Sequence, residues 1–107
     1  MSEEFRGRIR SSSQAPEFGE NSEELARLGQ GNVVIEHILS GALPSPVHYD
    51  QAHDEWVLVY EGAAVLEVGD ERFDLIRGDW VLLPARVPHR LVETLPGTSW
   101  LAVHCFV

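Results

Sequence analysis

The sequence predicts an all-β fold built as a single closed barrel or jelly roll. From Val33 onward, short runs of apolar and β-branched residues alternate with turn residues, and no stretch keeps the 3.6-residue apolar period of a helix. About eight such runs follow one another at the spacing typical of closed β structures. The 107 residues suffice for one domain and leave no room for a second core.

The expected strands are short and lie between residues that turn the chain. They cover residues 33–39, 47–50, 55–60, 63–68, 72–75, 80–83, 89–93 and 100–106. The breaks between them contain Gly41, Pro44, Pro46, Gly62, Gly69, Gly78, Pro84, Pro88, Pro96 and Gly97. We therefore assign residues 31–107 to the barrel.

Residues 1–30 are expected to form a partly ordered N-terminal arm. Up to Gly19 this segment is rich in Ser, Arg, Glu and Gln, so it offers little apolar surface to bury. Residues 21–29 fit either a single helical turn with Asn21 as its cap or an edge strand.

The composition excludes several classes of partner. With 17 acidic and 8 basic residues the formal net charge is −9, which repels nucleic acids and anionic lipid surfaces. No apolar run approaches the roughly 18 to 20 residues of a membrane span, and the N-terminal residues lack the apolar core of a signal peptide. The single cysteine, Cys105, cannot form an internal disulfide and suits a reducing compartment. We expect a cytoplasmic protein that binds neither nucleic acid nor membrane.

Potential metal ligands are concentrated just before and at the start of the strand expected at 55–60. His48, Asp50, His53 and Glu55 offer imidazole and carboxylate groups within a short stretch. Side chains two apart on a strand share a face, so His48 can lie beside Asp50, and His53 beside Glu55. Glu55 also shares its face with Val57, and an ionised carboxylate in apolar surroundings must be paired, protonated or bound to a cation.

This segment resembles the first motif of the cupin superfamily. That motif has two histidines separated by one residue, then three or four residues, a glutamate, six residues and a glycine. With the four-residue spacing, His48, Asp50, Glu55 and Gly62 occupy these positions, and Asp50 stands where the second histidine is usual.

A later segment resembles the second cupin motif, which runs glycine, five residues, proline, one residue, glycine, two residues and histidine. Gly78, Pro84, Arg86 and His89 occupy these positions, and Arg86 replaces the second glycine. The two motifs occur in the expected order and cover roughly half of the chain.

The resemblance implies a cupin-type double-stranded β-helix that holds a divalent transition metal such as Fe, Mn, Ni or Zn. It carries over His48, Glu55 and His89 as metal ligands, with Asp50 in the place of the second histidine and His53 as a substitute ligand. These side chains could instead form a polar pocket in which they only hydrogen-bond one another. Asp50 could equally cap a turn.

The strand expected at residues 100–106 is apolar on both faces. Trp100, Ala102 and His104 lie on one face, and Leu101 and Val103 on the other. One face lines the barrel, where His104 is a candidate pocket residue. The opposite face must be covered by the arm or by a second subunit. We therefore expect a homodimer.

These observations predict a small metal-binding cupin that acts as a metal-dependent enzyme on a small organic molecule, for example as an oxygenase or an isomerase. The alternative is a non-catalytic cupin that binds a small ligand as a sensor or carrier. The fold does not decide between them, because the same barrel serves many unrelated reactions. The sequence has no phosphate-binding glycine loop, paired-cysteine motif or serine elbow, and it assigns no residue a catalytic role.

Overall fold

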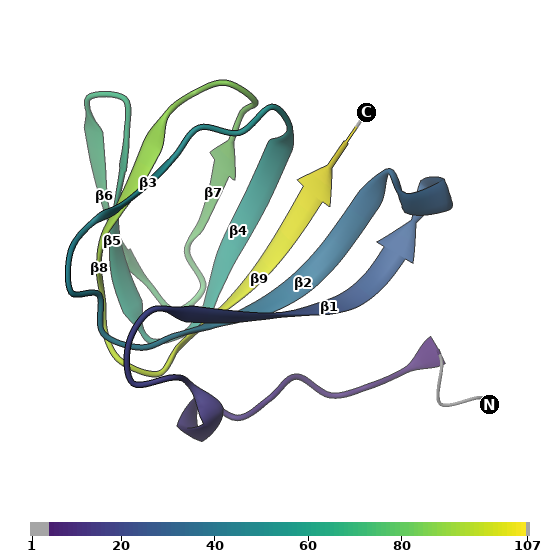
Figure 1. The fold of residues 1–107 in the computed structure, drawn as a ribbon, viewed down its shortest axis with the longest axis horizontal. Helices are drawn as coiled ribbons and strands as arrows, with labels where there is room; N and C mark the ends of the chain where they lie inside the picture. The colour runs from purple at the N-terminus through teal and green to yellow at the C-terminus, as the bar shows by residue number, and fades with distance from the viewer. Residues whose placement is uncertain (1–4, 107) are drawn as a thin grey trace.

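The computed structural model describes residues 5–106 as two antiparallel sheets that form a jelly-roll barrel (Figure 1). The strands are β1 (Glu20–Leu28), β2 (Val33–Ser40), β3 (Val47–Tyr49), β4 (Asp54–Glu61), β5 (Ala63–Val68), β6 (Glu71–Ile76), β7 (Trp80–Leu83), β8 (His89–Thr94) and β9 (Thr98–Cys105). Two short 3₁₀ turns are η2 (Ser12–Gln14) and η3 (Gly29–Gly31). The all-β prediction is confirmed. Within residues 5–106 no helix has the length and apolar character needed to cross a membrane.

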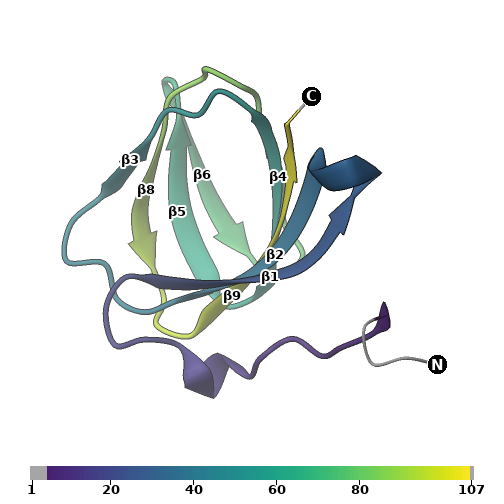
Figure 2. The same ribbon diagram turned by 45° about the vertical axis from the view of Figure 1, so that its right-hand side comes forward.

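One sheet has the strand order β1-β2-β9-β4-β7 and the other β3-β8-β5-β6. Figure 2 shows how the two sheets curve toward each other. Alternate residues of each strand point between them, because successive side chains of a strand lie on opposite faces. Val59 and Ala102 are completely buried there, and Leu66, Leu91 and Trp100 are almost so. Each large apolar side chain buried in this way contributes about 1.5 to 3 kcal/mol.

Residues 21–29, for which a helical turn and an edge strand both fitted the sequence, form most of the edge strand β1, and Gly29 begins η3. This strand pairs with β2 from Glu20 opposite Ser40 to Leu28 opposite Val33, with one irregularity between Glu24 and Ala26. The boundary expected near residue 31 therefore falls in the η3 turn between two paired strands, and part of the expected arm belongs to the sheet. The expected arm and barrel also include residues 1–4 and 107, which lie outside the described residues.

The rest of the described arm runs along the outer side of the five-stranded sheet, near β1 and β2 in Figure 1. Arg10 Nη2 donates a hydrogen bond to the carbonyl oxygen of His37 over 3.1 Å. Ser12 Oγ donates to a carboxylate oxygen of Glu61 over 2.9 Å. His37, on the outer face of β2, is completely buried. The arm thus covers one end of this outer face.

His37 is held as a neutral imidazole. Burial lowers its pKa below the usual 6.5, the Arg10 guanidinium lowers it further, and Glu23 opposes them. Arg10 Nη2 lies 3.5 Å from Nδ1 and can only donate, so Nδ1 accepts and Nε2–H donates to Ser99 Oγ over 2.6 Å.

His37 is therefore expected to make stability depend on pH. Between the lowered pKa of the folded state and 6.5, the unfolded chain binds more protons, so the free energy of unfolding falls as the pH drops below 6.5. The loss is at most about 1.4 kcal/mol per pH unit. Urea unfolding at about pH 7.5 and about pH 5.5, without added metal, should show a smaller difference for His37→Gln than for the wild type. An equal difference in both proteins would contradict this assignment.

Gly62 is expected to be irreplaceable at the turn between β4 and β5. Its φ is +95°, and an added Cβ would lie 2.8 Å from Thr98 Cα. Gly69 is a matched control, because its φ is also positive (+58°) but nothing lies within 4 Å of an added Cβ. In urea unfolding, Gly69→Ala should cost about 1 to 2 kcal/mol for the backbone conformation. Gly62→Ala should cost about 1 to 3 kcal/mol more. Equal losses would show that the contact with Thr98 relaxes freely.

Candidate metal centre and cavity

A cavity of about 160 Å³ lies between the two sheets. Its deep part is lined by almost completely buried apolar side chains, among them Val57, Leu66, Leu83, Leu91 and Trp100. Polar side chains from β1, β2, β3, β8, β9 and the start of β4 line the remainder. The cavity is therefore apolar inside and polar toward its mouth.

The pairing of β4 with β9 places two of the candidate residues side by side. Glu55 lies directly opposite His104 in the register, and directly paired residues have Cβ atoms about 4.5 to 5.5 Å apart. His53 precedes Glu55 by two residues, and its Nε2 lies 2.9 Å from His104 Nδ1. One ligand atom from each of His53, Glu55 and His104 lies within 4.8 Å of the other two. These three residues form the candidate metal centre.

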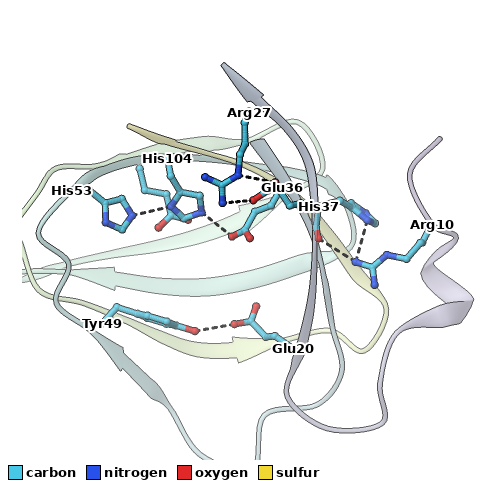
Figure 3. Close-up of polar contacts among 10 residues, drawn as sticks. Arg10, Glu20, Arg27, Glu36, His37, Tyr49, His53 and His104 are labelled. Carbon is cyan, nitrogen blue, oxygen red and sulfur yellow. Dashed lines mark hydrogen bonds and ion pairs between the residues drawn. The ribbon is translucent and has the colours of Figure 1, made fainter. Parts of the chain in front are cut away.

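Glu36, on β2, fixes the orientation of His104. A carboxylate oxygen of Glu36 lies 2.7 Å from His104 Nε2 (Figure 3). Because an ionised carboxylate can only accept, the proton of His104 belongs on Nε2, and Nδ1 is left with a lone pair. In the hydrogen-bonded arrangement, His53 Nε2–H donates to that lone pair. That lone pair is the one that His104 could offer to a metal ion shared with His53 and Glu55.

Glu55 is the unusual member of this group. The residue is only 7% exposed, and no hydrogen bond to its carboxylate exists among residues 5–106. Its closest basic contact is His104 Nε2, which lies 3.9 Å from Oε2. A buried carboxylate without a close partner is costly, so this position suits a bound cation.

A second polar group lies on another part of the cavity wall. The rings of Tyr49 and His89 stack with centroids 5.1 Å apart and planes inclined by 14°. Tyr49 Oη donates to Glu20 Oε1 over 2.8 Å, and Ser40 Oγ donates to Glu20 Oε2 over 2.9 Å. His89 Nδ1 lies 3.4 Å from the carbonyl oxygen of Val87, to which it donates, leaving Nε2 with a lone pair.

Tyr49 remains a neutral phenol in this environment. Burial raises its pKa well above the usual value of 10, and the charges of Glu20 and Glu55 and the hydrogen bond to Glu20 raise it further. Tyr49 therefore acts at neutral pH as a hydrogen-bond donor, and here it donates to Glu20.

The structure brings some of the residues predicted from the sequence together and leaves others apart. Glu55 and His89 are buried and line the cavity, and His53 joins Glu55 at the candidate metal centre. His48 and Asp50 are exposed and do not line the cavity. This pair therefore does not lie with Glu55 on the cavity wall. Strand alternation gives the reason for His48, since Tyr49 points inward and its neighbour on β3 points outward.

The three-residue spacing of the first cupin motif gives a different assignment from the four-residue spacing. It places Tyr49 and Gln51 at the two histidine positions, and both line the cavity. Glu36 and Glu20 were not identified as site residues from the sequence. They approach the site only because β2 pairs with β9 and β1 pairs with β2. The alternation of Glu36 with apolar neighbours on an inward face was the only available signal for it. His104, expected as a pocket residue, lines the cavity and adds a nitrogen to the candidate centre.

Comparison with known proteins gives one family match. The family model described as a cupin domain matches residues 34–103, more than half of the chain. No curated protein matches the sequence.

Many solved structures resemble this fold. A candidate mannose-6-phosphate isomerase from Ralstonia eutropha JMP134 is 32% identical, with a TM-score of 0.74, over 94% of this chain and 100% of that chain. A cupin superfamily protein from Desulfitobacterium hafniense is 22% identical, with a TM-score of 0.73, over 90% of this chain and 87% of that one. KdgF from Halomonas sp. is 18% identical, with a TM-score of 0.73, over 83% of this chain and 82% of that one. The last two similarities concern the fold alone.

Proposed function

Because the chain belongs to the cupin family, we propose that it binds a divalent transition metal through His53, Glu55 and His104 and acts on a small organic molecule held in the cavity. The observation that carries this proposal is the Glu55 carboxylate, which is buried and accepts no hydrogen bond from the described residues. A cation at this position would compensate its charge.

The donor set fits a transition metal. Two imidazole nitrogens and one carboxylate oxygen are ligands that Fe, Mn, Ni and Zn accept, and rigid strands hold two of the three residues. Three protein ligands leave coordination positions for water or a substrate, and a bound ion supplies a Lewis acid there. Glu36 provides the outer support found at many metal centres, a carboxylate that accepts from the far nitrogen of a ligating histidine.

In this proposal His89 contacts the molecule bound in the cavity and is not a metal ligand. Its ring stacks on Tyr49, and its free Nε2 can accept a proton or a hydrogen bond from a ligand in the cavity. The 32% identity to the Ralstonia eutropha relative shows a shared family, and members of one fold can act on different substrates.

The metal centre predicts a specific loss of metal on mutation. After reconstitution with Zn²⁺ or Mn²⁺ and removal of free metal, elemental analysis should find about one ion per chain. The double variant His53→Ala/His104→Ala should retain almost none, whereas His48→Ala, which removes an exposed histidine near the same segment, should retain the wild-type content. Metal content that is unchanged in the double variant would overturn the assignment.

Glu36 should affect the affinity for metal without contacting it. Glu36→Gln keeps an oxygen that can accept from His104 Nε2 but removes the charge. Loss of such an outer partner typically weakens metal binding about 10- to 100-fold. A competition titration against a chromophoric chelator measures this change. Unaltered affinity would mean that Glu36 has only a structural role.

We further propose that a second copy of the chain covers the outer face of the five-stranded sheet. Two rows of side chains cross β2, β9, β4 and β7 on this face: Ile35, Val103, Trp56 and Leu82, and then His37, Leu101, Leu58 and Trp80. The arm reaches His37, but Trp80 and Leu82 are 61% and 55% exposed. An apolar face of this kind can meet its own copy across a two-fold axis.

This dimer is expected to dissociate when a charge is placed in its centre. Sedimentation or light scattering should find a dimer for the wild type and a monomer for Leu82→Glu, because a buried unpaired carboxylate opposes association. Leu95→Glu is the control, since Leu95 is similarly exposed (57%) but lies in the loop between β8 and β9. A monomeric wild type, or dissociation by the control alone, would refute the proposed interface.

A further inference from the structure

The charges that line the cavity are all of one sign. Glu20, Glu36 and Glu55 contribute three carboxylates to its wall. The chain has no lysine, and none of its eight arginines, all within residues 5–106, lines this cavity. Arg27 lines an adjoining groove that shares Glu36 and His104 with this cavity, and it is ion-paired with Glu24 at 2.7 Å.

Neutral partners do not cancel these charges. Glu20 accepts hydrogen bonds from the hydroxyl groups of Tyr49 and Ser40, which hold the carboxylate in place and leave it negative. Glu36 accepts from the Nε2–H of His104. A divalent ion at Glu55 would offset two of the three charges, so the wall remains negative with or without metal.

Two kinds of group on the wall are free to bind a molecule. Gln51 and Ser22 can both donate and accept. The Glu55 carboxylate, which has no hydrogen bond among the described residues, and the lone pair of His89 Nε2 can only accept. Tyr49, a donor on the wall, is already committed to Glu20. Hydroxyl hydrogens on a ligand would satisfy these acceptors, whereas a phosphate or carboxylate would add further acceptors and further negative charge.

Size and polarity narrow the choice of ligand further. A cavity of about 160 Å³ is close to the roughly 150 Å³ that encloses a benzene ring in a protein interior. The apolar part of the wall includes Trp100 and Leu66, each 4% exposed, and the acceptors Glu55 and His89 are nearly as buried, at 7%.

From these features we infer that the cavity takes a small uncharged molecule with an apolar body and a hydroxyl group, and that it rejects organic phosphates and carboxylates. This inference rests on the proposed function only in that the cavity is the binding site. It does not require the metal, because the three carboxylates select against anions without it.

The test compares benzyl alcohol with benzoate, which share one ring and differ in the charge of the substituent. Calorimetric or NMR titrations should show benzoate binding at least about tenfold more weakly than benzyl alcohol. Both the metal-loaded protein and the protein dialysed against a chelator are titrated. Preference for benzyl alcohol in a protein that retains no metal after reconstitution would support this inference while contradicting the metal centre. Metal binding with equal or tighter binding of benzoate, or with no binding of either compound, would overturn the inference and leave the metal centre standing.

A matched pair of variants isolates the charge at the mouth. Glu20→Gln keeps an oxygen that can accept from Tyr49 or Ser40 but removes one negative charge from the wall, so benzoate affinity should rise about three- to tenfold while metal content is unchanged. Glu23→Gln removes the same charge from β1 at a residue that does not line the cavity and lies 3.8 Å from Arg10. It should leave benzoate binding unaltered. Equal effects of the two variants would show that only the net charge of the chain matters.

Discussion

The candidate site depends on one buried carboxylate. Glu55 begins the inward face of β4, and the next inward residues, Val57 and Val59, are core residues. An ionised carboxylate next to such a core is unfavourable unless another group compensates its charge. The polar groups nearby lie where they could do so. His104 lies directly opposite on β9, and His53 reaches the same point from the segment before β4.

Strand pairing builds this arrangement from residues far apart in the sequence. β9 lies between β2 and β4, so His104 contacts Glu36 on one side and approaches Glu55 on the other. The result is a line of side chains running from Glu36 through His104 to His53 (Figure 3). The proton of His104 lies on Nε2, toward Glu36, and leaves a lone pair on Nδ1. That lone pair accepts a hydrogen bond from His53 here, and the same lone pair could bind a metal ion.

The sequence was sufficient for the fold and for part of the site. Apolar alternation and turn residues located the strands from Val33 onward, because both are local properties of the chain. Which residues of a three-residue strand point inward cannot be read from the neighbouring sequence alone. β3 has too few residues for a clear pattern, and shifting the motif by one position exchanges His48 and Asp50 for Tyr49 and Gln51. The contributions of Glu36 and Glu20 depend on which strands become neighbours, and no spacing in the sequence states this.

The features that distinguish this cavity lie partly outside the residues that identify the family. The family match covers residues 34–103, which include Glu55 and His89 but neither Glu20 nor His104. Glu20 comes from the edge strand β1, and His104 from the end of β9. Glu20 adds a negative charge to the wall, and in the proposed centre His104 adds a third ligand to His53 and Glu55 of the matched region. Family membership therefore explains why this chain has a barrel with an interior cavity, whereas residues on either side of the matched region add to the polar groups that line it.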